Sequence, residues 1–325
     1  MDEFDLIHSI TPHSHYHPSV DVGIGDDGAV YTASPHMQQI VCLDTMVENV
    51  HFKLEYSSPH DIGYKALAVN ISDVAAMGGI PKFYLVSLAV PFCWQKADVQ
   101  AMYEGMAELA KLYQMDLIGG DTVSASGQAV ITVTVIGEVE KDRACLRSSA
   151  RPGDVVFVTG DIGSSAAGLS LLLGETLPSA FHTSDYFIRK HKRPVPRVQV
   201  GRFCSQLQRA ALNDISDGLA SELHEIAEAS SVTIEIEEQL LPVHPDLPEA
   251  DSEWKKWVLF GGEDFELVGT VSQQEWISLL DYCTQSGIPI AKIGAVSERK
   301  EACVLLTAND HRQIVLEKKG YNHFK

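Results

Sequence analysis

The stretch SPHDIGYKALAVNISDVAAMGGIPKFYLVSLAV, residues 58–90, carries the clearest local structural signals in the chain. Ser58-Pro59 is typical of a helix N-cap followed by proline at the first helical position. We expect this helix to run to Met77 and to end at Gly78-Gly79, because glycine readily adopts the conformation that terminates a helix. The apolar run 83–90 then predicts a buried strand. A helix followed at once by a buried strand indicates a structure that mixes α and β elements.

Strands and helices alternate on both sides of this stretch. Further helices are predicted at 97–113, after the Gly/Ser/Ala turn at 160–168 and from near residue 217. Strands are predicted near residue 20 and at 39–43, 129–139, 155–159, 233–237, 257–260 and 265–270. The polar segment RSSARPGD, residues 147–154, lies between the two halves and reads as a linker. We therefore expect an α/β (α+β) protein of two domains, 1–148 and 149–325. The length of 325 residues agrees at roughly 150 residues per domain.

The composition excludes several classes of protein. Hydrophobic residues make up 45% and charged residues 21%, as in ordinary globular chains, so a disordered chain is excluded. Lys and Arg number 25 against 44 Asp and Glu, and the net charge of -19 disfavours nucleic-acid and membrane-surface partners. The longest apolar run, 83–94, contains Pro91 and is shorter than the roughly 20 residues of a membrane-spanning helix.

The termini and cysteines favour a reduced, cytoplasmic protein. The N-terminus MDEFD is acidic where a secretory signal is basic and then apolar. The six cysteines stand far apart without a C-x-x-C pair, which argues against a zinc site or a dense disulfide framework.

Many acidic residues occur beside glycine or other small residues. Such segments are GIGDDGA (23–29), LDT (43–45), SDVAAMG (72–78), GGDT (119–122), DISDG (214–218) and GGED (261–264). Glycine permits tight backbone turns and the close approach of a ligand. Asp44 ends an apolar run, and Asp73 shares a helix face with Ala66, Asn70 and Met77, which points it inward or into a cleft.

If these carboxylates converge, they need cations. Two carboxylates about 4 Å apart repel by about 4 kcal/mol at an effective dielectric constant of 20. Ligands that are all oxygen favour Mg²⁺ or Mn²⁺ over zinc, and Mg²⁺ recruits phosphates. The sequence thus suggests an enzyme that acts on phosphates through Mg²⁺. The alternative is that each Asp caps a helix or shapes a turn.

Two glycine-rich segments have competing interpretations. GIGDDG (23–28) matches the dinucleotide-binding pattern G-x-G-x-x-G, but Asp26 and Asp27 would face a pyrophosphate, and 29–35 is too short for a crossover helix. GDIGSSAAG (160–168) either offers backbone N–H groups to a phosphate or packs a helix tightly on a sheet. The chain contains neither a P-loop nor the protein-kinase motifs.

At these segments the sequence resembles the thiamine-monophosphate kinase family, within the superfamily of aminoimidazole ribonucleotide synthetase. The resemblance runs through nearly the whole chain in order. Its motifs are GIGDD (23–27), DTMV (44–47), YKALAVNISDVAAMG (64–78), LIGGDT (117–122), LRSSARPGD (146–154), DISDGL (214–219), GGEDFEL (261–267) and GYNHF (320–324). It implies ATP-dependent phosphorylation of thiamine monophosphate to thiamine diphosphate by Mg²⁺-assisted in-line transfer. It also implies a two-domain fold whose N-terminal sheet pairs across a homodimer.

The resemblance also implies the site residues. The metal ligands that it implies are Asp27, Asp44, Asp73, Asp121, Asp214 and Asp217. The implied ATP contacts are Tyr103, Gly120, Asp121, Arg147 and Ser216, and the implied substrate contacts are His51, Glu263 and Tyr321. No side-chain base is required, because the phosphate of the substrate is itself an anionic nucleophile. Several Mg²⁺ ions and ATP are the expected cofactors, with domain 1–148 binding metal and ATP and domain 149–325 completing the substrate site.

The chain departs from the family at two places. Cys42 and Leu43 precede Asp44 where the family usually has hydroxyl residues, so a side-chain oxygen near one metal is lost. Tyr321 replaces a tryptophan, and tyrosine stacks on a cationic ring less strongly. Two alternatives therefore stay open: a related ATP-dependent synthetase acting on another small phosphate, and a non-catalytic protein that binds nucleotide or thiamine phosphate.

Overall fold

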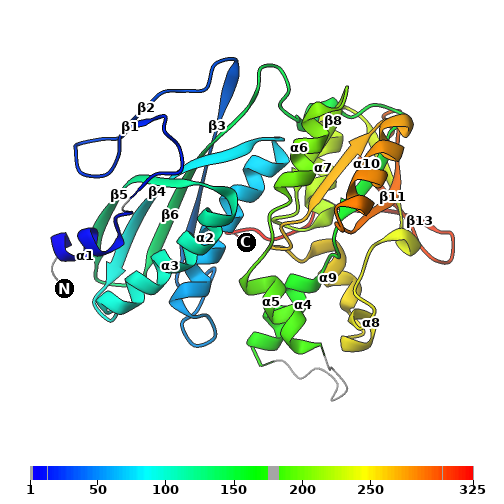
Figure 1. Cartoon of the computed structure of the whole chain (residues 1–325). Coiled ribbons are helices and arrows are strands. Elements are labelled where there is room, and N and C mark those ends of the chain that lie inside the picture. Colours follow the sequence, from blue (N-terminus) through cyan, green and yellow to red (C-terminus); the bar gives the residue numbers. More distant parts are fainter. Residues whose placement is uncertain (1–2, 13, 175–182, 302, 325) are drawn as a thin grey trace. The chain divides into compact units, whose positions relative to one another are not determined.

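The computed structural model describes residues 3–12, 14–174, 183–301 and 303–324. The chain forms two compact units. The first unit spans residues 1–74 and 79–142, and the second spans 75–78 and 143–325. Each unit has its own sheets and helices (Figure 1), and each is described by itself below.

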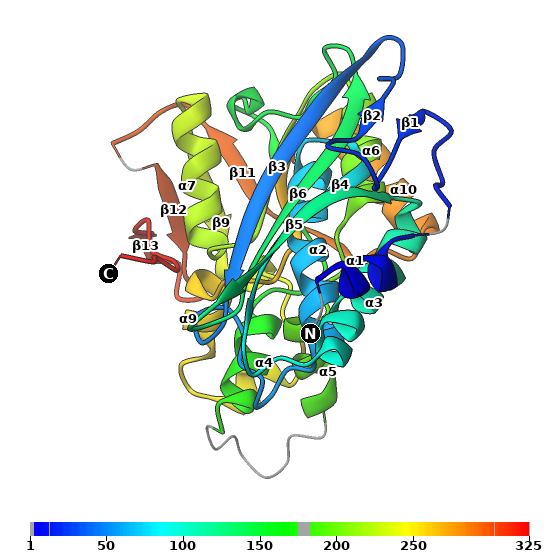
Figure 2. The same ribbon diagram turned by 90° about the vertical axis from the view of Figure 1, so that its left-hand side faces the viewer.

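The first unit is a four-stranded sheet with helices on one face. Its elements are α1 (Glu3–Ile10), β1 (Val20–Val22), β2 (Val30–Tyr31), β3 (Met37–Val47), α2 (Pro59–Ala76), β4 (Ile80–Pro91), α3 (Lys96–Tyr113), β5 (Asp116–Ala125) and β6 (Val130–Glu140). The strand order is β3-β6-β4-β5, with β4 and β5 parallel and the other neighbours antiparallel. Helices α2 and α3 lie behind the sheet in Figure 2.

Burial alternates along the strands and distinguishes the two sheet faces. Val133 of β6 and Val86 of β4 are fully buried on the face that α2 and α3 cover, here called the covered face. Thr132 and Ser87, each one residue away, are more exposed and belong to the opposite, open face. Successive side chains of a strand point to opposite faces, so this alternation assigns the residues of the regularly paired stretches to one side or the other.

Glycine sets the spacing between α2 and α3. A Cβ atom at Gly63 would lie 1.8 Å from the backbone oxygen of Met102, and one at Gly105 would lie 1.9 Å from that of His60. The two helices therefore touch backbone to backbone at these glycines. The N-cap of helix α3 is Gln95, whose N–H donates to the carboxylate of Asp98 at 2.7 Å in a capping box.

The second unit contains a seven-stranded sheet of order β13-β12-β9-β11-β7-β10-β8. Its strands are β7 (Val155–Thr159), β8 (Ala210–Asp214), β9 (Thr233–Glu237), β10 (Leu267–Val271), β11 (Ile290–Ser297), β12 (Val304–Thr307) and β13 (Gln313–Val315). Its helices are η1 (Arg147–Ser149), α4 (Ser164–Leu172), α5 (Ser184–Lys192), α6 (Val198–Gln206), α7 (Leu219–Ser230), η2 (Glu238–Leu240), α8 (Leu247–Ala250), α9 (Trp254–Phe260) and α10 (Gln273–Gln285). A core of fully buried side chains, among them Val158, Leu223 and Ile234, holds the sheet and α7 together.

The predicted fold class is confirmed, and one element is corrected. The chain is a mixed α/β protein with strands and helices alternating in both units. The segment 257–260, predicted as a strand, is the end of helix α9. Trp254, Trp257 and Val258 have the i, i+3, i+4 spacing of a helix face, a pattern that a four-residue window does not reveal.

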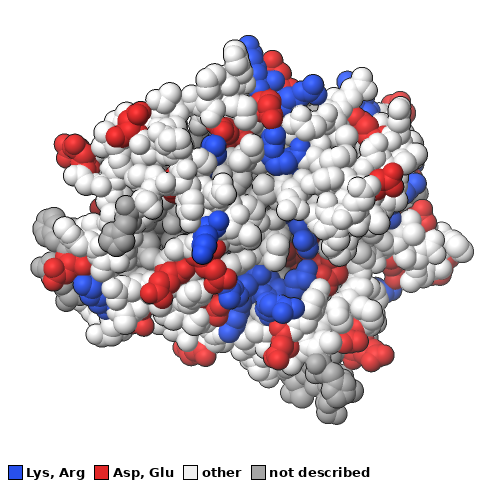
Figure 3. Space-filling model, viewed as in Figure 1, with Lys and Arg blue, Asp and Glu red and all other residues white. Residues whose placement is uncertain are grey.

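The distribution of charge on the second unit is uneven. On the face drawn in Figure 3, Lys and Arg side chains gather over α5, whose last turn is basic. Lys190 of this helix forms ion pairs with Asp161 at 2.7 Å and with Glu266 at 3.1 Å. Within the part of the chain that is described, no helix is both long and apolar enough to cross a membrane.

Candidate active site

In the first unit, two of the predicted metal ligands meet. Asp44 of β3 lies on the covered face, opposite Val133, and its carboxyl group hydrogen-bonds with that of Asp73 on α2. Burial raises the pKa of Asp44, while the hydrogen bond with Asp73 and the nearby ring of His51 lower it. Two of the acids considered together in the sequence are thus neighbours within this unit.

Cys42 lies beside this acid pair. Its Sγ donates to the backbone oxygen of Asn70 at 3.2 Å. Burial raises the pKa of the Cys42 thiol strongly, and the charges of Asp73 and Asp44 raise it further. The Cys42 thiol is therefore protonated in the metal-free protein. Leu43 lies on the open face and is 58% exposed.

His51 is held close to Asp44 by a tight turn after β3. The N–H of Val47 donates to Nδ1 of His51 at 3.0 Å. Nδ1 is therefore the acceptor, and in the neutral ring the proton sits on Nε2. The half-buried imidazole can thus offer one N–H donor to an anionic ligand.

Asp121 lies on the other face of the same sheet. The register aligns Asp44 with Val133 and then Val86, all on the covered face. Asp121 of β5 pairs with Ser87, on the open face. Asp44 and Asp121 are three strands apart, about 14 Å at the usual strand spacing of about 4.8 Å. Since Mg²⁺–oxygen bonds are about 2.1 Å long, one ion does not bridge these two residues within one chain.

The other predicted residues of this unit differ in exposure. Asp27 is exposed in the loop between β1 and β2, where its N–H donates to Asp26 at 2.9 Å. Gly120 leaves no room for a side chain, because a Cβ would lie 2.2 Å from the backbone oxygen of Val86. Tyr103 of α3 is 8% exposed, and burial raises the pKa of its phenol, which therefore stays a neutral O–H group.

In the second unit, three sequence-distant segments are fastened together by backbone hydrogen bonds, here called the loop clasp. The N–H of Glu263 donates to the oxygen of Ser216 at 2.7 Å, and the N–H of Tyr321 donates to the oxygen of Asp217 at 3.1 Å. Asp214, 4% exposed, ends β8 just before this loop. The loop clasp thus brings together predicted residues for metal, nucleotide and substrate.

Arg147 joins the same region through a polar chain. Its Nε donates to the side-chain oxygen of Asn213 at 3.0 Å, and the amide of Asn213 donates to Glu222. The other oxygen of Glu222 accepts the N–H of Asp217 at 3.1 Å. Burial, and after it the charge of Asp214, raises the pKa of Glu222 to about 8.

Sequence analysis missed Glu222. It lies in the first turn of α7 and is 4% exposed. Its proximity to DISDG in the sequence was an available signal, since an acid in the first helical turn can bond the N–H groups of the preceding loop. Its role here is to fix the loop that carries Ser216 and Asp217.

In the GGEDFEL segment, the neighbouring acids Glu263 and Asp264 make different contacts. Glu263 has a positive φ of 66°, and its carboxylate lies 3.5 Å from Nδ1 of His191. Asp264 accepts the N–H groups of Gly163 at 2.7 Å and Ser165 at 3.0 Å. Burial raises the pKa of Asp264 to about 7. The two backbone N–H groups at the start of α4 are therefore already hydrogen-bonded to Asp264 and are not available to a phosphate. This favours the interpretation that residues 160–168 pack a helix on the sheet.

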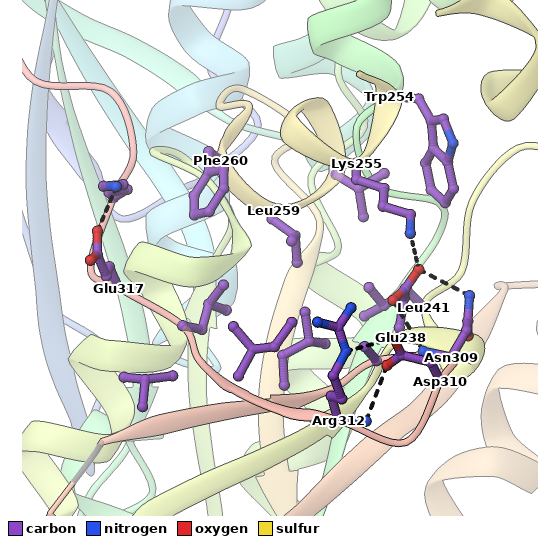
Figure 4. Close-up of a pocket in the computed structure, with 17 residues that line it drawn as sticks. Glu238, Leu241, Trp254, Lys255, Leu259, Phe260, Asn309, Asp310, Arg312 and Glu317 are labelled. Carbon is purple, nitrogen blue, oxygen red and sulfur yellow. Dashed lines mark hydrogen bonds and ion pairs between the residues drawn. The ribbon is translucent and has the colours of Figure 1, made fainter. Parts of the chain in front are cut away.

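Tyr321 keeps an accessible ring. The residue is 50% exposed and its ring makes an edge-on contact with His323, with centroids 4.9 Å apart. A separate cavity of about 550 Å³ lies between α9, β12 and β13 (Figure 4). Phe260, Leu306 and Leu316 are among the described residues that line it, and none of the predicted site residues is.

Two family models match this chain. AIR synthase related protein, N-terminal domain, matches residues 25–139, and AIR synthase related protein, C-terminal domain, matches residues 151–305. The fold and the acid-rich loops thus define an AIR synthase-related protein of two domains.

The full-length relatives are more specific. The thiamine-monophosphate kinase of Bacillus subtilis (strain 168) is 68% identical over 326 residues, covering all of both chains. That of Escherichia coli (strain K12) is 36% identical over 307 residues, 94% of this chain and 92% of the relative. The chain belongs to the thiamine-monophosphate kinase family.

Solved structures agree with this assignment. Thiamine-monophosphate kinase from Stenotrophomonas maltophilia K279a superposes with a TM-score of 0.82 at 30% identity, covering 92% of this chain and 94% of that one. AaThiL complexed with AMPPCP and TMP superposes with a TM-score of 0.77 at 32% identity, covering 93% and 92%.

Proposed function

We propose that this protein transfers the γ-phosphoryl group of ATP to thiamine monophosphate, giving thiamine diphosphate and ADP. The loop clasp carries this proposal, because its hydrogen bonds join the proposed metal ligand Asp217 and the proposed nucleotide contact Ser216 to Tyr321 and Glu263, the proposed substrate contacts. Family membership and the complex of AaThiL with AMPPCP and TMP support the same reaction.

Mg²⁺ fits the donor groups on both units. Asp44 and Asp73 present carboxylate oxygens to each other, and the neighbouring Cys42 thiol is kept protonated, so the donors are hard oxygens. The proposed ligands are Asp27, Asp44, Asp73 and Asp121 in domain 1–148, and Asp214 and Asp217 in domain 149–325. Bound Mg²⁺ would neutralise the negative charge that spreads over the transferred phosphoryl group.

The residues of this chain position the reactants without acting as a base. An oxygen of the substrate phosphate attacks the γ-phosphorus, and the bond from that phosphorus to the oxygen of ADP breaks. The side chain of Arg147 is 51% exposed; its Nε donates to Asn213 and its Nη1 lies 3.6 Å from Glu225. The guanidinium fork is the proposed contact for the ATP phosphates, which would compete with Glu225 for Nη1. Ser216, Tyr103, Gly120 and Asp121 are the further proposed nucleotide contacts.

The substrate contacts follow from charge and exposure. His51 offers its Nε2–H to the phosphate of thiamine monophosphate, and Glu263 offers a carboxylate to the cationic part of the molecule. Tyr321, with its ring half exposed, stacks on a heteroaromatic ring of the substrate.

A homodimer accounts for the open face of the first unit. Val41, Leu43 and Val123 lie on this face and are 66%, 58% and 50% exposed. Two such faces packed together bury these side chains, as the family resemblance implies. Asp121 lies on the same open face, so we infer that it serves the nucleotide at the dimer interface. We place this enzyme in the cytoplasm, in agreement with its six free cysteines, all within the described residues.

The test is a product assay with purified protein, ATP, Mg²⁺ and thiamine monophosphate as sole acceptor. We expect ADP and thiamine diphosphate in equal amounts, and no product when thiamine, which lacks the acceptor phosphate, is supplied instead. ATP consumption only with another small phosphate would favour a related synthetase. Binding of both ligands without ADP formation would favour a non-catalytic binding protein. Either result would overturn the proposal.

A further inference from the structure

The second unit contains a cluster of three side chains of mixed ligand chemistry, apart from the proposed active-site residues. His224 and Glu228 lie four residues apart on α7, and Cys303 directly precedes β12. One ligand atom from each lies within 4.8 Å of the other two. Residues four apart share a helix face, so α7 presents the imidazole and the carboxylate together.

The imidazole of His224 is held in the orientation and tautomer of a metal ligand. Its side chain is 10% exposed, and Nε2 lies 2.7 Å from the backbone oxygen of Leu316. Because a carbonyl oxygen only accepts, Nε2 carries the proton and Nδ1 carries a lone pair. Metal-binding histidines commonly donate their second ring N–H to such a partner, which fixes the ring.

The other ring nitrogen points into the cluster without a hydrogen bond. Nδ1 of His224 is buried and has no hydrogen-bond partner among the described residues. It lies 3.7 Å from Oε1 of Glu228, too far for a hydrogen bond. Two electron-rich atoms thus face each other across a gap, and burying an unpaired polar atom costs free energy. A cation between them removes this cost.

Hydrogen bonds also position the other two proposed ligands, Glu228 and Cys303. Oε2 of Glu228 accepts from Lys318 at 2.9 Å, which keeps the carboxylate ionised and leaves Oε1 for a cation. The backbone of Cys303 is fixed, since its oxygen accepts the N–H of Ile234 at 2.9 Å. Ligand atoms of one tetrahedral zinc ion lie about 3.3–3.6 Å apart, given Zn–N and Zn–S bonds of about 2.0 and 2.3 Å. Rotation of the exposed Glu228 side chain and a small movement of Cys303 close the cluster to that size.

We propose that His224, Glu228 and Cys303 form a binding site for Zn²⁺ that is separate from the Mg²⁺ sites of the reaction. One nitrogen, one sulfur and one oxygen ligand suit zinc rather than Mg²⁺, and water completes the tetrahedron. Binding releases the thiol proton of Cys303, and the thiolate and carboxylate then balance the charge of the ion. The ion fastens the last turns of α7 to β12, and the bond from His224 to Leu316 adds the C-terminal segment that leads to Tyr321.

The test uses the full chain, stripped with a chelator and kept in excess Mg²⁺ so that the oxygen-rich sites are filled. Co²⁺ reports thiolate ligation by its charge-transfer absorption, and Zn²⁺ affinity is measured by competition with a chromophoric chelator. We expect one equivalent per chain. In Cys303→Ser the charge-transfer band disappears and Zn²⁺ affinity falls at least about tenfold. The matched control Cys93→Ser, at an exposed cysteine of the first unit, keeps both.

Glu228→Gln provides a second variant at an exposed position, and far-ultraviolet circular dichroism confirms that each variant is folded. We expect it to keep the charge-transfer band while weakening Zn²⁺ binding. Absence of stoichiometric binding in the parent chain overturns the proposal. So does a band that survives in Cys303→Ser, which would assign the ion to another cysteine.

Discussion

Replacing Asp44 by Asn should make the metal-free protein more stable while it abolishes turnover. A hydrogen bond between two carboxyl groups needs a proton, which the pair must hold against the pH of a neutral solution; the amide of Asn donates to Asp73 without that cost and keeps the size of the side chain. Two carboxylates about 4 Å apart repel by about 1 kcal/mol in water and about 4 kcal/mol at an effective dielectric constant of 20. Asp44 as a whole residue is exposed, although partial burial raises the pKa of its carboxyl group, and Asp73 is half-buried, so we expect a gain of about 1–2 kcal/mol, near the lower limit.

The assay is urea unfolding of both proteins in EDTA and in Mg²⁺, together with the kinase assay. Mg²⁺ should stabilise the parent protein, since a ligand bound only by the folded state raises its stability, and should stabilise Asp44→Asn less. Glu104→Gln, at an exposed acid on α3, is the matched control and should change neither stability nor activity. If Asp44→Asn is less stable than the parent in EDTA, or turns over normally at limiting Mg²⁺, Asp44 is a structural residue and not a cation ligand.

Three further predictions test the packing and assembly. Glu266→Gln should lower the unfolding free energy by about 3–5 kcal/mol in urea, because it breaks a buried bidentate pair with Arg197. Burial alone would raise the pKa of Glu266, but its charged partners, Arg197 first, hold it below the ordinary value. The contribution of the ionised Glu266 to the free energy of unfolding should therefore be complete above about pH 4.3, the pKa in the unfolded chain. It should be lost as the pH falls through the lower pKa of the folded state. Leu43→Lys should give a monomer by light scattering and lose turnover, with stability changed by only about 0.5 kcal/mol, because the side chain is exposed in the single chain. Gly63→Ala should lower the melting temperature, because its methyl group would lie 1.8 Å from the backbone oxygen of Met102, and overpacking of this kind costs about 1–3 kcal/mol.

The sequence predicted the elements whose signals are local. The helix α2 has an N-cap, a proline and a terminal glycine pair, and the structure places it at Pro59–Ala76. Strand β5 was not predicted, because its residues DLIGGDTVSA mix glycine, charge and hydroxyl groups without alternation. That strand is stabilised by parallel pairing with β4, a long-range interaction that no local window contains.

In the candidate site too, the residues with a local sequence signal were predicted, and those that depend on tertiary contacts were not. The contact between Asp44 and Asp73 agrees with the inference that Asp73 points inward or into a cleft. Glu222 and the cluster around His224 were not predicted, because their contacts involve residues that are distant in the sequence and that only the tertiary fold brings together. The absence of a C-x-x-C pair argued against a zinc site, yet one cysteine that meets a helix face carrying His and Glu supplies ligands that spacing rules do not cover.

The strand register limits how far the charge argument extends. Mutual repulsion requires short distances, and in the first unit that condition is met by Asp44 and Asp73. Asp121 carries the same charge beside the same kind of glycine, but it lies on the open face, three strands away. Because Asp121 is exposed, solvent screens its charge, and no cation is needed to stabilise it within one chain. A functional carboxylate there makes physical sense only if something covers the open face and lowers the local dielectric constant. The exposed apolar side chains Val41 and Leu43 on that face favour contact with a second copy of the chain over contact with solvent. The proposed role of Asp121 therefore depends on the proposed dimer, and a monomeric active enzyme would contradict both.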